Sequence, residues 1–312
     1  EGNFLALRGV NTSNVGAHAV SFVPLNKGRE LASTVYRIPA ASMRGRAVLS
    51  NTSPTTPYRS AGRPEVMFIM ERLIDLAARR HGFDRVELRR RNLIPAGAMP
   101  YRNPFGIVYD SGDYAAVLDR AVALADWAGF EKRRAEARAR GRYRGIGIAN
   151  YIEIATGAPR ERAEITVHPE GRIDVVLGTL SSGQGHETSF AQFIAEWFEV
   201  ELDQVRLITG DTDVATVGGG SHSGRSMRLG AVVMARASDQ IVDRGKRIAA
   251  WMLEAADADI EFARRRFAVK GTDRSVDLFE VAAAARRPDT PEALRGPLAG
   301  VSDETMSVPS FP

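Results

Sequence analysis

Three polar loops in this sequence combine glycine with hydroxyl and amide side chains, a composition suited to binding an anion. The first loop is residues 51–63 (NTSPTTPYRSAGR), the second is 181–186 (SSGQGH) and the third is 218–226 (GGGSHSGRS). Each runs directly into a stretch with helical periodicity. A helix start presents unpaired N–H groups and the positive end of the helix dipole, and glycine lets a ligand approach the backbone. The three loops together predict a site for one large anionic ligand.

Two other interpretations of these loops remain open. Asn, Ser, Thr and Gly are ordinary N-cap residues, so each loop could simply be the capped start of a helix in a non-catalytic globular fragment. Gly183 and Gly185 on either side of Gln184 count against this, because glycine is a costly helix start unless a ligand approaches it. The spacing from Gly219 to Ser226 is that of a P-loop-like nucleotide-binding protein, but Arg225 stands where such a loop has lysine.

The remaining chemistry-bearing residues exclude several classes of site. The sequence has no cysteine, so this chain offers no disulfide, no iron–sulfur ligand and no thiol nucleophile. Its five histidines fall in separate segments without the spacing of a metal cage, and we predict no direct protein–metal site.

Composition describes an ordinary globular chain. The 312 residues are 44% hydrophobic and 26% charged, and 42 basic against 38 acidic residues give a net charge of +4. This small excess is a weak argument for nucleic acid, and we expect no nucleic-acid partner. No uninterrupted apolar run approaches the roughly 18 residues of a membrane span, so we expect no such span and a cytoplasmic location.

Hydrophobic periodicity predicts the elements that position the loops. Strands are expected over residues 4–24 around a turn at 11–16, a hairpin over 162–168 and 172–178, and a short strand over 205–209. Helices are expected over 63–80, 113–125, 187–200 and 227–254, the last with Gly230 and Gly245 as weak points. The fold class is therefore α+β, as two mixed α/β layers.

The Ala/Arg-rich stretch 131–142 (EKRRAEARARGR) has few side chains that could be buried, so we place a domain junction there. This divides the chain into residues 1–130 and 143–312. The sequence begins and ends without a recognisable start or tail, and reads as an internal portion of a longer protein.

A set of motifs, in order and with similar spacing, resembles the molybdopterin-binding large subunit of the xanthine dehydrogenase and aerobic carbon-monoxide dehydrogenase family, the molybdenum hydroxylases. The motifs are YRSAGRPE at 58–65, ERLID at 71–75, ELRRRNLIP at 87–95, YDSGD at 109–113, GQGHET at 183–188, GDTD at 210–213 and GGGSHSGRSM at 218–227. The resemblance covers nearly all 312 residues, and the ordered set of motifs makes it specific.

The resemblance implies a molybdenum cofactor held through a pyranopterin dithiolene, often as the cytosine dinucleotide, between two similar halves. This chain would be the latter part of the first half joined to the first part of the second. The residues implied at the cofactor are Arg59 and Ser60 at the molybdenum end; Ser182 and Gln184 at the pterin, within a loop shared with Gly183, Gly185 and His186; and Ser223, Gly224, Arg225 and Ser226 on pterin or pyrophosphate oxygens.

The resemblance also implies oxidation of an aldehyde, an N-heterocycle or a similar activated C–H substrate, with water as the oxygen source. Electrons would leave through an iron–sulfur small subunit and an FAD-containing medium subunit. The Gly-x-Gly-Glu segment that carries the family's base is absent here, so no catalytic residue is assigned, and the chain alone is expected to be inactive without the rest of its subunit or a partner chain. The copper-containing branch has a cysteine where this sequence has Ser60, so no copper is expected.

Overall fold

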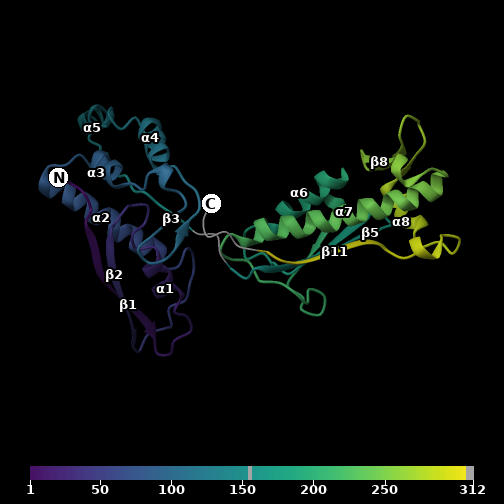
Figure 1. The fold of residues 1–312 in the computed structure, drawn as a ribbon, viewed down its shortest axis with the longest axis horizontal. Coiled ribbons are helices and arrows are strands. Elements are labelled where there is room, and N and C mark those ends of the chain that lie inside the picture. Colours follow the sequence, from purple (N-terminus) through teal and green to yellow (C-terminus); the bar gives the residue numbers. More distant parts are fainter. Residues whose placement is uncertain (154–156, 307–312) are drawn as a thin grey trace. The chain divides into compact units, whose positions relative to one another are not determined.

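The computed structural model describes residues 1–153 and 157–306. The chain divides into two compact units, and we call residues 1–155 unit one and residues 156–308 unit two. Both contain helices and small sheets, which confirms the α+β class (Figure 1).

Unit one contains a parallel pair of long strands, β1 (Ala6–Gly16) and β2 (Ala40–Leu49), with helix α1 (Val23–Glu30) between them in the sequence. The predicted turn at 11–16 is wrong, because β1 runs straight to Gly16 and residues 17–22 form no strand. The partner of β1 lies beyond α1, and local alternation cannot reveal such a long-range pairing. A second, shorter pair is β3 (Tyr101–Arg102) with β4 (Val108–Tyr109).

The described residues of unit one also form four further α-helices: α2 (Arg63–His81), α3 (Arg85–Asn92), α4 (Tyr114–Leu124) and α5 (Phe130–Ala139). Helix α2 confirms the prediction, with Pro64 in its first turn and Gly82 ending it at φ 71°. Its inner face packs Met67, Met70 and Ile74 into the core of the unit.

The predicted junction at 131–142 is not where the compact units divide. Helix α5 occupies most of it and lies inside unit one, and the division falls about a dozen residues later. Ala, Arg and Glu are strong helix formers, so a solvated helix can have the same composition as a domain junction.

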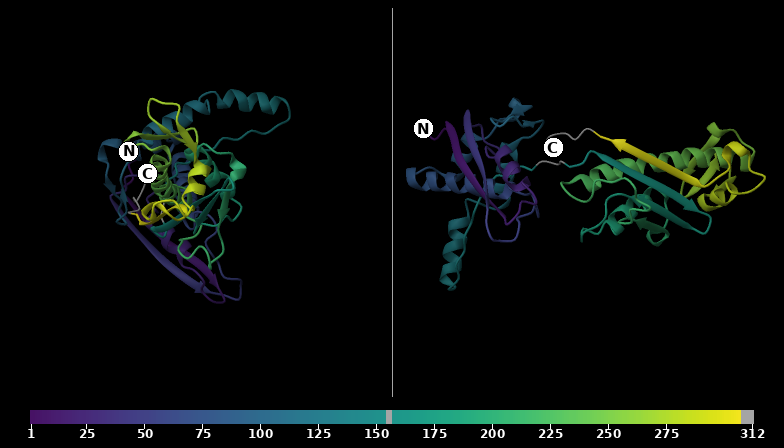
Figure 2. Two further views of the ribbon diagram at one scale, coloured as in Figure 1. Left: turned by 90° about the vertical axis from the view of Figure 1, so that its right-hand side faces the viewer. Right: turned by 90° about the horizontal axis from the view of Figure 1, so that it is seen from below.

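Unit two is built on a four-stranded sheet in the order β11-β5-β6-β7. Strands β5 (Arg160–His168) and β6 (Arg172–Leu177) form the predicted antiparallel hairpin, β11 (Leu298–Thr305) pairs with β5, and β7 (Val205–Ile208) runs parallel to β6. Helices α6 (His186–Phe198) and α7 (Arg225–Leu253) pack on one face of the sheet (Figure 2).

Unit two also contains helix α8 (Leu278–Ala284) and a three-stranded sheet of β8 (Ile260–Ala263), β9 (Arg266–Val269) and β10 (Ser275–Asp277). In residues 1–153 and 157–306, single 3-10 turns span Ala96–Ala98, Leu202–Gln204, Asp257–Asp259 and Glu292–Leu294.

Helix α7 is continuous through both glycines that were predicted as weak points. A Cβ on Gly245 would lie 2.2 Å from the ring of Phe267, and one on Gly230 would lie 3.4 Å from Leu177 and Phe190. Glycine at 245 therefore lets β9 approach the helix closely, and its cost in helix propensity is offset by that packing.

Candidate cofactor site

The second and third loops converge in unit two. The Gln184 Nε2 donates a hydrogen bond of 2.8 Å to the Ser221 Oγ, which lies 3.2 Å from the Ser226 Oγ. The Gln184 side-chain carbonyl accepts a hydrogen bond from the Ser182 N–H. The amide of Gln184 thus holds the two loops against each other, at the starts of α6 and α7. The first loop lies in unit one.

Backbone contact between Gly178 and Gly218 makes this convergence possible. A Cβ built on Gly178 would lie 2.2 Å from the Cα of Gly218, and one on Gly218 would lie 2.3 Å from the Cα of Gly178. The end of β6 therefore crosses the beginning of the third loop at a distance that only glycine at both positions permits.

A fully buried ion pair holds the third loop on the sheet. The Arg225 Nη1 lies 2.7 Å from the Glu161 Oε2, and both side chains have no exposed surface. The Thr179 hydroxyl donates to the same carboxylate at 2.8 Å. The guanidinium also donates to the carbonyls of Gly220, Ala158 and Arg160 at 2.7–2.9 Å.

These contacts engage the Arg225 guanidinium inside the protein, whereas the resemblance implies that Arg225 lies on pterin or pyrophosphate oxygens. In this conformation Arg225 holds the third loop on the sheet through the Gly220 carbonyl. Glu161 and Thr179 hold Arg225 in place, and the sequence analysis does not predict this contact. Glu161 was detectable, because the buried positions of β5 alternate through Ala163, Ile165 and Val167 and continue back to 161.

All three loops lead into helices that begin after a left-handed glycine. Gly62 precedes α2 at φ 88°, Gly185 precedes α6 at φ 74° and Gly224 precedes α7 at φ 70°. None of these N-cap glycines has a side chain that could cap the helix, so side-chain capping does not account for the polar residues of the three loops. One N–H group in each first turn donates to the preceding backbone, Arg63 to Ser60, Thr188 to Gly185 and Arg225 to His222. The other first-turn N–H groups can bind water or an oxyanion.

Buried nitrogens without a hydrogen-bond partner gather at the same three helix starts. They are the Arg63 Nε in α2, the His186 Nδ1 in α6, and the Nε and Nη2 of Arg228 in α7. Buried polar atoms are nearly always paired, so unpaired nitrogens beside uncapped helix starts fit an anionic ligand that supplies oxygen acceptors. Around Gly183 and Gly185 a Cβ would meet nothing within 4 Å, which leaves the backbone open to such a ligand.

The first loop contains a run of left-handed residues, with Ser60 at φ 54° and Ala61 at φ 37° before Gly62. Left-handed backbone in non-glycine residues costs roughly 1–3 kcal/mol each and persists only when its surroundings impose it. Arg63 imposes it here, because its Nη1 donates to the Ser60 carbonyl at 3.1 Å and lies 2.7 Å from a Glu153 carboxylate oxygen.

Tyr151 connects this turn to Glu153. Its hydroxyl donates to the Glu153 carboxylate at 2.7 Å and lies 3.4 Å from the Ser60 Oγ. Burial raises the pKa of Tyr151 and the Glu153 carboxylate raises it further, while the Ser60 contact lowers it. The neighbouring Arg59 is exposed. Tyr151 and Glu153 lie far from the loop in sequence, and nothing in their local pattern predicted their place here.

Across residues 1–153 and 157–306 the structure gathers no group of three His, Asp or Glu side chains that could hold a metal ion. Within the same residues no helix has the length and apolarity required to cross a membrane.

Comparison with known proteins gives matches along most of the chain. Two family models, both described as molybdopterin cofactor-binding domain, match residues 1–93 and 120–305. The gamma subunit of the 6-hydroxypseudooxynicotine dehydrogenase complex of Paenarthrobacter nicotinovorans is 35% identical over 83% of this chain and 33% of its own length. The carbon monoxide dehydrogenase large chain of Afipia carboxidovorans is 35% identical over 76% of this chain and 32% of its own.

The fold is similar to solved structures as well. Quinoline 2-oxidoreductase from Pseudomonas putida 86 superimposes with a TM-score of 0.83 and 30% identity, over 98% of this chain and 41% of that one. The chain spans about a third of the length of the relatives in the sequence comparison.

Proposed function

Because this chain belongs to the molybdopterin-binding large subunits of the molybdenum hydroxylase family, we propose that its second and third loops form one wall of the cofactor site. Gln184 and the backbone of Gly183 and Gly185 would bind the pterin, with Ser182 and His186 beside them. The third loop, from Ser223 to Ser226, would present N–H groups and hydroxyls to pterin or pyrophosphate oxygens, and the cytosine dinucleotide form suits this double set of donors.

In unit one, Arg59 and Ser60 would lie at the molybdenum end of the cofactor. The left-handed turn at Ser60 and Ala61 leads directly into α2. Arg63 holds this turn in place through the Ser60 carbonyl. When bound, the cofactor supplies the oxidation of an activated C–H bond with water as the source of oxygen. The residues of this chain bind and orient it.

One observation carries this proposal: in the described residues, buried side-chain nitrogens without a hydrogen-bond partner occur at the starts of α2, α6 and α7, the three helices into which the loops lead. A P-loop-like nucleotide site is not favoured. It needs a lysine directed at the phosphates, whereas Arg225 is buried against Glu161.

The activity, substrate and partners of the whole enzyme are part of the proposal. We infer a hydroxylase or dehydrogenase acting on an N-heterocycle or aldehyde, with N-heterocycles preferred, because similar proteins are named for nicotine and quinoline. An iron–sulfur subunit and an FAD subunit would carry the electrons away, since this chain has no cysteine.

The test is cofactor content in the full-length subunit purified with its partners. Gln184→Ala removes the amide that joins the two loops, and Gln192→Ala removes an exposed amide from the surface of α6. A lost hydrogen bond of about 1.5 kcal/mol predicts roughly tenfold weaker cofactor retention for Gln184→Ala and none for the control. Equal molybdenum and pterin content in the two variants would contradict the proposal.

A further inference from the structure

Residues 144–152 form an extended segment that has the alternation of a β-strand but no strand partner. The side chains at 146, 148, 150 and 152 are partly or fully buried, and those at 145, 147, 149 and 151 are exposed. This is the period of two that a strand shows. In the described part of the chain, no backbone hydrogen bond joins this segment to any other element.

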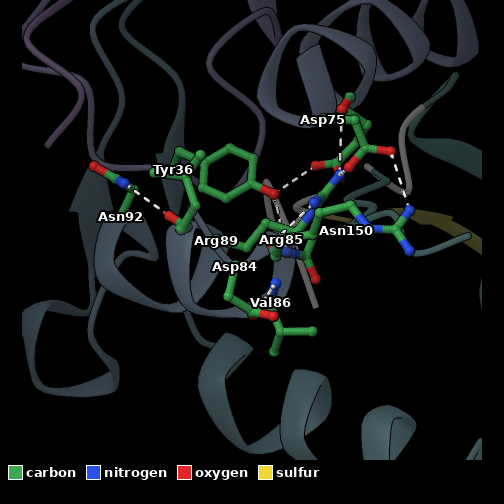
Figure 3. A network of polar contacts seen from close by, with 10 residues as sticks. Tyr36, Asp75, Asp84, Arg85, Val86, Arg89, Asn92 and Asn150 are labelled. Atoms are coloured by element: carbon green, nitrogen blue, oxygen red, sulfur yellow. Dashed lines mark hydrogen bonds and ion pairs between the residues drawn. The ribbon is translucent and has the colours of Figure 1, made fainter. Parts of the chain in front are cut away.

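The inner side of the segment is fixed by a buried polar network (Figure 3). The Asn150 Nδ2 donates to the Tyr36 hydroxyl at 2.9 Å, and that hydroxyl donates to Glu71 of α2 at 2.5 Å. The Arg89 Nε donates to the same Glu71 carboxylate at 2.7 Å, and its Nη2 lies 2.9 Å from Asp75. Figure 3 shows the Tyr36 hydroxyl, Arg89 and Asp75 pointing toward one another beside Asn150. The segment is therefore held extended against α2.

Helix α2, which shares a pocket with this segment through Phe68, has an exposed apolar surface. Phe68 is 71% exposed, and Ile69, Leu73 and Leu76 follow on the same face at 52%, 49% and 42%. A pocket of about 390 Å³ lies between this helix and residues 147–151, with Phe68, Glu71 and Arg72 on its α2 side. A helix usually buries its apolar face, so this surface lacks a partner.

Two glycines leave space for a second backbone. A Cβ built on Gly145 or on Gly147 would meet no atom within 4 Å. Glycine on the exposed side of a strand is typical of places where another backbone approaches closely, and an unpaired strand beside apolar side chains is a template for strand addition.

We propose that residues 144–152 together with Phe68, Ile69, Leu73 and Leu76, here called the open edge, form the docking site for a β-strand from the part of the large subunit outside this chain. The chain spans about a third of the length of its relatives, so a polypeptide about twice its size remains to supply that strand. The docked strand pairs with residues 144–152, inserts an apolar side chain into the pocket and places acidic side chains near Arg72, Arg79 and Arg80.

Amide hydrogen exchange compares this chain alone with the full-length subunit, both free of cofactor, so that the result does not depend on the cofactor site. Peptides that cover 144–152 are expected to exchange rapidly in the chain alone and about tenfold or more slowly in the full-length subunit. Exchange that is equally fast in both overturns the proposal. Equally slow exchange in both also overturns it, because the occupant is then unit two or a second copy of this chain.

A pair of exposed substitutions tests the apolar part of the open edge. Phe68→Glu places a charge in it, and Val117→Glu places one on α4, where Val117 is 68% exposed. In the chain alone neither substitution is expected to lower the midpoint of thermal unfolding. In the full-length subunit Phe68→Glu lowers it and restores rapid exchange at 144–152, whereas Val117→Glu does neither. Identical behaviour of the two variants in the full-length subunit refutes the docking site.

Discussion

The side chains of Glu161 and Arg225 have no exposed surface. Water cannot solvate either charge, so each charge is compensated by the other. Removing one partner of such a pair leaves an uncompensated buried charge, which costs about 3–5 kcal/mol. We therefore expect Arg225→Ala to lower the free energy of unfolding by that amount in urea titrations. Arg138→Ala, on the exposed surface of α5, should change it by less than about 0.5 kcal/mol.

The same pair of variants distinguishes positioning from direct binding. If Arg225 acts only by positioning the third loop, the full-length Arg225→Ala enzyme loses molybdenum together with stability. A loss of molybdenum at unchanged stability would instead indicate that the guanidinium reaches the cofactor directly.

Tyr109 makes unit one sensitive to alkaline pH. Burial raises the pKa of its hydroxyl to about 12, and this hydroxyl donates to the Thr34 carbonyl at 2.8 Å. Because the folded-state pKa lies above the unfolded value of 10.0, this contribution to stability is complete below pH 10 and is lost as the pH rises toward 12. The expected slope is about 1.4 kcal/mol per pH unit for each such tyrosine.

Unfolding by urea between pH 9 and 12 checks this dependence. Tyr109→Phe should make the slope shallower by one proton, while exposed Tyr143→Phe, at 96% exposure, should leave it unchanged. Identical slopes in all three proteins would exclude Tyr109 as the cause.

Because residue 60 is a serine, we expect no copper ion at the first loop. A Cu(I) ion requires a soft thiolate ligand, and a serine hydroxyl cannot replace it. We predict that the intact enzyme contains molybdenum but no stoichiometric copper, although the chain is similar to a structure described as Cu,Mo-CO dehydrogenase. Elemental analysis of the purified complex measures both metals, and one copper per molybdenum would disprove the assignment.

At the scale of elements, the two glycines of α7 should respond oppositely to alanine. Alanine at 245 would place a Cβ 2.2 Å from the Phe267 ring, and such overpacking costs typically 1–3 kcal/mol, more than the gain of about 1 kcal/mol in helix propensity. Alanine at 230 meets ordinary contacts at 3.4 Å and should be neutral or stabilising. Thermal unfolding of the two variants measures the difference, and a stabilised Gly245→Ala would contradict the packing argument.

Helices α2, α6 and α7 could be predicted because their apolar side chains follow one face and their glycines lie at the termini. The hairpin of β5 and β6 was equally visible, since it is local and alternates. The parallel pair β1 and β2 could not be predicted, because its two strands are separated by α1 and by the loops on both sides of it. Composition also failed to separate the exposed helix α5 from a linker.

In the candidate site, too, local features could be predicted from the sequence and long-range contacts could not. Gln184 and the glycines were predicted from local chemistry, and the structure joins the second loop to the third. The burial of Arg225 depends on its contacts with Glu161 and Thr179. These residues are distant from Arg225 in the sequence and come close to it only when the sheet forms. The role of Arg63 likewise depends on Glu153. Partners that are brought together by long-range contacts leave no signal in the spacing of a loop.

At the scale of the whole molecule, we predict that this chain supplied with cofactor does not turn over substrate repeatedly. It contains no cysteine for an iron–sulfur centre and lacks the family's glutamate motif, so both the exit for electrons and the base would be missing. A general base is typically worth about 10² to 10⁴ in rate. Steady oxidation of an aldehyde or N-heterocycle with an artificial electron acceptor would contradict this. The complex with partner subunits is the positive control.

Gly178 and Gly218 limit how this sequence can vary over evolution. A side chain at either position would clash with the backbone of the other glycine. Every residue has this backbone, so no substitution at one position can compensate for a substitution at the other. The two positions should therefore be invariant together. Methods that infer contacts from correlated substitutions need positions that vary, so this crossing, on which the convergence of the two loops depends, would be invisible to them.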